Sequence, residues 1–90
     1  MPEEVMRTLD QARKEPTNFE AQVSAAELYY QIQRYDDAIG YLLKANRLRP
    51  DDFETVANLA MMNTESGHFA SAEKWYDAAL AMQPGNITIL

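Results

Sequence analysis

The chain has 90 residues, of which 47% are hydrophobic and 24% are charged, and its net charge is −6. This length allows one small domain, and the balance of residues is that of a globular protein rather than a disordered chain. The acidic charge argues against a nucleic-acid partner, and the absence of cysteine excludes disulfides and thiolate metal sites and favours a reducing, cytoplasmic location.

Five helical segments are expected in succession, because alanine, leucine, glutamate and other good helix formers dominate the sequence. The expected ranges are 3–15, about 19–32, about 36–49, about 53–66 and about 70–82. No apolar run approaches the ~20 residues that span a bilayer, so no membrane partner is expected. Pro50 and Pro84 stand where a helix must stop, and Gly67 supplies the left-handed residue that commonly follows a helix. Helix-capping aspartates are expected at Asp36, Asp51 and Asp52.

These segments repeat with a period of 34 residues, the spacing that separates Pro16, Pro50 and Pro84. The same shift places alanine on alanine in three pairs: Ala26 and Ala60, Ala38 and Ala72, Ala45 and Ala79. Alanine lets two helix axes approach closely. The space that remains is expected to be filled by Tyr29, Tyr35, Leu42, Phe69 and Tyr76. One hairpin cannot bury its apolar face alone, but stacked hairpins can.

The period and these residues resemble the tetratricopeptide repeat, whose pattern is W-x₂-L-G-x₂-Y, then A-x₃-F, then P. The pattern falls on Gln22, Ala25, Ala26, Tyr29, Ala38, Leu42 and Pro50, and again on Val56, Leu59, Ala60, Asn63, Ala72, Tyr76 and Pro84. The tryptophan position is lost in both repeats, whereas the second helix and the proline match well.

The resemblance implies an all-α fold, in which antiparallel helix hairpins stack as a short right-handed superhelix. Residues 1–90 would form one domain. Within it, residues 3–15 are a divergent half-repeat or capping helix, 19–52 and 53–86 are two repeats, and 87–90 begin a truncated further helix.

In the family, the first helix of each hairpin lines a concave groove that holds peptides. By alignment, the groove residues here are Glu20, Val23, Glu27, Tyr30, Gln31, Glu54, Ala57, Asn58, Met61, Thr64 and Glu65. Four of the eleven are acidic and none is basic, so a neutral or basic protein or peptide segment is the expected partner. Capture of a C-terminal carboxylate, known from one subgroup, is disfavoured because Val23 and Glu27 occupy the places of its lysine and asparagine.

Self-association through the C-terminal apolar end is the alternative to peptide binding. That end carries Trp75, Tyr76, Leu80, Met82, Ile87, Ile89 and Leu90. An enzyme is not expected, because His68 is the only histidine, the three glycines are isolated, and no Ser-His-acid motif is present. We also expect no metal and no cofactor.

Overall fold

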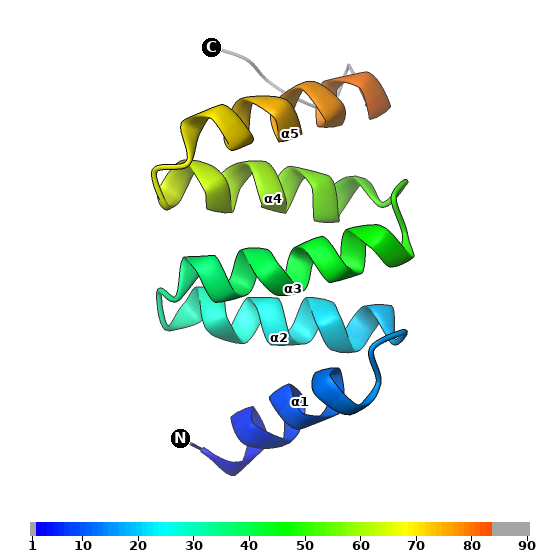
Figure 1. The fold of residues 1–90 in the computed structure, drawn as a ribbon, viewed down its shortest axis with the longest axis vertical. Coiled ribbons are helices and arrows are strands. Elements are labelled where there is room, and N and C mark those ends of the chain that lie inside the picture. Colours follow the sequence, from blue (N-terminus) through cyan, green and yellow to red (C-terminus); the bar gives the residue numbers. More distant parts are fainter. Residues whose placement is uncertain (1, 84–90) are drawn as a thin grey trace.

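The computed structural model describes residues 2–83, which form five antiparallel helices stacked one on the next (Figure 1). The helices are α1 (Glu3–Lys14), α2 (Phe19–Gln31), α3 (Tyr35–Leu48), α4 (Phe53–Glu65) and α5 (Phe69–Met82). The predicted all-α fold of stacked hairpins is confirmed, and each observed helix lies on one of the predicted segments. The further helix expected from residues 87–90 lies outside the described residues.

The starts of the two first helices, α2 and α4, are fixed by equivalent side chains 34 residues apart. The side chain of Asn18 accepts a hydrogen bond from the Ala21 amide at 3.1 Å, and that of Asp52 accepts one from the Thr55 amide at 3.0 Å. These bonds satisfy amides that lack a partner inside the helix. Of the three aspartates expected to cap helices, Asp52 does so. Asp36 lies inside the first turn of α3, and Asp51 precedes the capping residue of α4.

The turn inside each hairpin uses a residue with positive φ, again at equivalent positions. Gly67 has φ 84° and Gln33 has φ 62°. In the first turn, the Arg34 amide donates to the Tyr29 carbonyl at 2.9 Å, and in the second, the His68 amide donates to the Asn63 carbonyl at 2.8 Å. These bonds close the C-terminus of each first helix. The left-handed residue predicted at Gly67 is confirmed, and its equivalent one repeat earlier, Gln33, also has positive φ although its residue type does not favour that conformation.

Substitutions at the two positive-φ positions are therefore expected to have opposite effects on stability. We expect Gln33→Gly to stabilise the fold by about 0.5–1 kcal/mol, because glycine adopts positive φ without a Cβ clash. We expect Gly67→Ala to destabilise it by about 1 kcal/mol, and this cost is one of backbone strain because an added Cβ would meet no atom within 4 Å. Urea denaturation of both variants measures the two changes. A stabilising Gly67→Ala would contradict the explanation.

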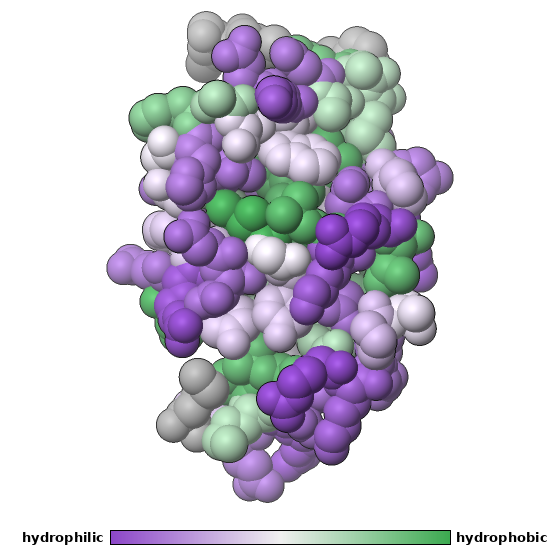
Figure 2. All heavy atoms as spheres, viewed as in Figure 1, coloured by the Kyte–Doolittle hydropathy of each residue, from purple (hydrophilic) through white to green (hydrophobic). Residues whose placement is uncertain are grey.

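The core is built from small residues at the helix contacts and a few large ones between them. All six repeated alanines are buried, and Leu42 and Leu59 are the largest apolar side chains that are fully buried. With Met62 and two of these alanines, the leucines form the central cluster, against which Trp75 packs. In Figure 2 a hydrophobic patch lies near the middle of the visible face, with polar side chains on either side.

Two expected core residues lie on the surface instead. Phe69 is 68% exposed and Tyr76 is 40% exposed. Their equivalents in the first hairpin are Tyr35 and Leu42, and Leu42 is buried because α4 covers that side of α3. No described helix covers the corresponding side of α5. The expectation that Phe69 and Tyr76 fill the space between helices was therefore wrong within residues 2–83.

The N-terminal helix of the chain, α1, is attached to α2 by a buried side-chain amide. Gln22 is fully buried, and its Nε2 donates to the backbone carbonyls of Ala12 at 2.9 Å and Glu15 at 3.0 Å. These carbonyls belong to the last turn of α1 and the residue after it, where carbonyls lack partners inside the helix. Gln22 occupies the tryptophan position of the repeat pattern, so a polar side chain here has a structural role.

Candidate functional site

The predicted groove residues form one stripe on each of the two first helices. On α2 they follow the spacing 20, 23, 27 and 30–31, and on α4 the spacing 54, 57–58, 61 and 64–65. Steps of three and four residues bring side chains to the same helical face. None of the eleven residues is buried: six are exposed, and Val23, Tyr30, Ala57, Asn58 and Met61 are half-buried. Both stripes are therefore accessible to a partner.

One hydrogen bond joins the two stripes. The Tyr30 hydroxyl on α2 donates to Oε1 of Glu65 on α4 at 3.2 Å. The ring of Tyr30 and the side chain of Met61 also pack against the central cluster, which gives each stripe a residue anchored on the core. The contact places the C-terminal ends of α2 and α4 on a common surface, which we call the first-helix face.

This hydrogen bond has a measurable signature. Donation to Glu65, with partial burial and the negative charge of Glu65, raises the pKa of the Tyr30 phenol above its ordinary value. The interaction favours folding while the phenol is neutral in both states, and it is lost as the pH rises through the folded-state pKa. We expect Glu65→Gln to lower the pKa of Tyr30, as followed by NMR of ¹³Cζ-labelled tyrosine. An unchanged titration would show that the bond is not formed in solution.

A cation that the sequence did not predict lies beside the α2 stripe. Arg49, which follows α3, places Nη2 3.4 Å from Oε1 of Glu20. Its guanidinium also lies 4.2 Å from the centre of the Phe19 ring. Arg49 is 29 residues from Glu20 along the chain, and only the reversal of direction between α2 and α3 brings them together. The edge of the first-helix face is therefore less acidic than its eleven residues alone suggest.

The other two acidic residues of the face have no such partner. Glu27 and Glu54 are exposed, and neither side chain makes an ion pair or a hydrogen bond with another residue of the described range 2–83. The half-buried Asn58 side chain likewise forms no hydrogen bond within this range. These three side chains keep their hydrogen-bonding capacity for an external partner.

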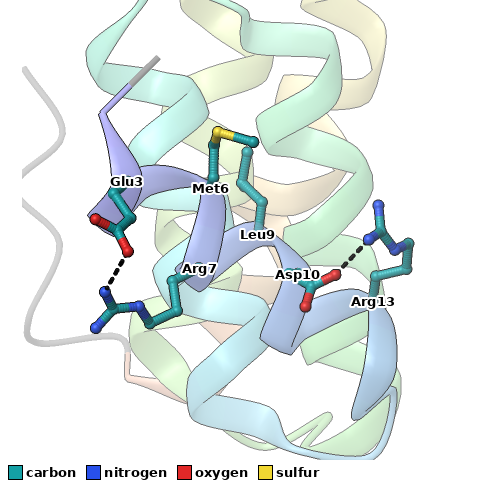
Figure 3. Close-up of a pocket in the computed structure, with 6 residues that line it drawn as sticks. All are labelled: Glu3, Met6, Arg7, Leu9, Asp10 and Arg13. Carbon is teal, nitrogen blue, oxygen red and sulfur yellow. Dashed lines mark hydrogen bonds and ion pairs between the residues drawn. The ribbon is translucent and has the colours of Figure 1, made fainter.

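The surface hollows lie mostly outside the stripes. One, of about 530 Å³, runs along α1, where Met6 and Leu9 lie between the ion pairs of Glu3 with Arg7 and Asp10 with Arg13 (Figure 3). A hydrogen bond from Lys14 lowers the pKa of the Asp10 carboxyl, and the positive charges of Lys14 and Arg13 lower it further.

The second hollow, of about 510 Å³, lies between the turns of the two hairpins. There Nε2 of His68 lies 3.0 Å from Oδ1 of Asp36. Of the stripe residues, Glu65 reaches this hollow.

The described residues offer no arrangement for metal chemistry. No group of three or more histidine, cysteine, aspartate or glutamate side chains within residues 2–83 could hold a metal ion. Within the same residues, each helix is too short or too polar to cross a bilayer.

Stacked antiparallel hairpins with an open first-helix face define a helical-repeat protein. A family model described as tetratricopeptide repeat matches residues 7–53 and again residues 25–87. The chain belongs to the tetratricopeptide repeat family. No curated protein matches the chain. Tetratricopeptide repeats generally mediate protein–protein interactions, and their members are typically scaffolds rather than enzymes.

Proposed function

We propose that this protein is an interaction scaffold that binds a neutral or basic peptide or protein segment on the first-helix face. The observation that carries the proposal is that all eleven stripe residues are accessible while the opposite sides of the same helices are buried. In this proposal residues 3–15 form a half-repeat, and residues 19–52 and 53–86 form two repeats. A cytoplasmic location, which the cysteine-free composition favours, is part of it.

The stripes combine the two features that a peptide site needs. Val23, Ala57 and Met61 provide apolar area that is only half-buried. Glu27, Glu54 and Asn58 provide polar groups without a partner in the described chain. Apolar contact supplies affinity, and polar groups at fixed positions supply orientation and specificity. Two hairpins offer a short surface, so we expect weak binding by this chain alone.

Chemical-shift mapping tests the proposal. Peptides selected from an unbiased library of short random sequences would be titrated into the ¹⁵N-labelled chain. We expect the largest shift changes on α2 and α4, at residues such as Val23, Asn58 and Met61. Val23→Asp with Ala57→Asp should abolish these changes, whereas Thr17→Asp, which places a single charge at an exposed position off the stripes, should not. Shift changes confined to α1 or α5 would contradict a first-helix site.

The uncovered side of α5 supports a second candidate function, self-association. Phe69 and Tyr76 expose large aromatic side chains on this helix, and exposed apolar surface of this kind can serve as a protein–protein contact. Light scattering at high concentration distinguishes the two functions. A dimer that is dispersed by Phe69→Glu with Tyr76→Glu would favour self-association, and a monomer at all concentrations would exclude it. Trp75 is unsuitable for this test because it packs against the core.

A further inference from the structure

We infer that the partner is a cationic, partly apolar segment, and that Glu27 and Glu54 are the residues that select its charge. The inference rests on the proposed function, since it concerns the same face. It goes further by assigning different roles to the four glutamates that the sequence treats alike. Two of them are already engaged within the chain, and two are not.

The engaged glutamates stand at the two ends of the face. Glu20, in the first turn of α2, meets Arg49 at 3.4 Å, and Glu65, the last residue of α4, accepts the Tyr30 hydroxyl at 3.2 Å. A cation brought by a partner would compete with Arg49 at Glu20 and with the hydroxyl at Glu65. These two carboxylates therefore give less to binding, and their contacts instead hold Tyr30 and Arg49 at the edges of the face.

The unengaged glutamates, like the engaged pair, lie within one helical turn of half-buried stripe residues, but their carboxylates are unpaired within residues 2–83. Glu27 is one helical turn from Val23 and from Tyr30, and Glu54 is one turn from Ala57 and Asn58. Each unpaired carboxylate is thus next to a half-buried side chain on which a partner can rest. Binding there would shield the carboxylate from solvent, which strengthens its attraction to a cation. A segment with lysine or arginine next to apolar residues complements this arrangement of charge.

The chain offers a matched pair of variants for the test. Glu27→Gln with Glu54→Gln and Glu20→Gln with Glu65→Gln remove the same charge from the same face, and each changes the net charge from −6 to −4. The probes are peptides selected on the wild-type chain from a library of short random sequences. We expect these peptides to be enriched in lysine and arginine. We expect the first variant to weaken their binding by about three- to tenfold and to reduce its salt dependence, and the second to weaken binding by a smaller factor.

The possible outcomes separate this inference from the function on which it rests. Equal losses in the two variants would show that the overall field attracts the peptide, and would overturn the assignment to Glu27 and Glu54. Selected peptides that bind α2 and α4 without enrichment in lysine or arginine would overturn the cationic partner but leave the first-helix site intact. Failure to select any peptide, or shift changes away from α2 and α4, would contradict the proposed function and this inference together.

Discussion

Leu59→Ala is expected to destabilise the fold by about 3 kcal/mol. Leu59 is fully buried in the central cluster, where it lies with Leu42 of the neighbouring helix α3 and with Met62 of its own helix, α4. Truncation removes buried methyl groups and leaves a cavity that the alanine-rich helix contacts cannot fill, since their backbones already approach closely. For a domain of this size, whose total stability is of the order of 5–10 kcal/mol, the loss is a large fraction. Urea denaturation followed by circular dichroism measures it.

Met6→Ala is the control for this prediction. Met6 is 58% exposed on α1, so its truncation creates no cavity and should cost less than about 0.5 kcal/mol. Similar losses at positions 6 and 59 would indicate that the central cluster does not dominate stability. A loss at Leu59 that spares the α1–α2 contact in hydrogen exchange would show instead that the hairpins unfold separately.

Gln22→Glu is expected to destabilise the fold by about 3 kcal/mol at pH 7, although it barely changes the shape of the side chain. The native amide donates to two carbonyls, and its own Oε1 is buried without a hydrogen-bond partner among residues 2–83. A carboxylate at position 22 would have no proton to donate and would face the two carbonyl oxygens. Hydrogen exchange of the α1 amides should increase most, because Gln22 attaches α1 to α2.

The pH dependence of this variant provides a second measurement. Burial raises the folded-state pKa of the introduced carboxyl above its unfolded value of about 4.3. The loss relative to wild type is therefore smallest near pH 4, grows as the pH rises from the unfolded to the folded pKa, and is constant above both. Gln11→Glu, on the exposed surface of α1, should lower the free energy of unfolding by less than about 0.5 kcal/mol at any of these pH values. A loss independent of pH would mean that no buried carboxylate forms.

The stripes on α2 and α4 could be predicted from the sequence, but the charge pairing along them could not. The helical period alone assigns residues 20–31 and 54–65 to stripes, and the alignment chooses the outward side. The predicted stripe residues include four carboxylates and no cation. In the folded chain Glu20 pairs with Arg49, because the reversal of direction in the hairpin brings the end of α3 beside α2. Glu65 accepts the Tyr30 hydroxyl, because stacking of the hairpins brings α4 within reach of Tyr30. The residues of these two pairs are separated by 29 and by 35 positions in the sequence, and no local sequence pattern reveals such contacts.

The sequence by itself determined the helices, their order and the alanine positions at which they touch. These follow from local propensity and from a repeat of 34 residues, since the same local pattern must fold in the same way twice. Tertiary structure alone decided which large residues are buried. Tyr76 aligns with buried Leu42 yet is exposed. Gln22 stands at the tryptophan position of the repeat pattern and is buried although it is polar. The physical reason is that burial depends on which helix packs on each side: among the described residues α3 packs on both α2 and α4, whereas α5 packs mainly on α4.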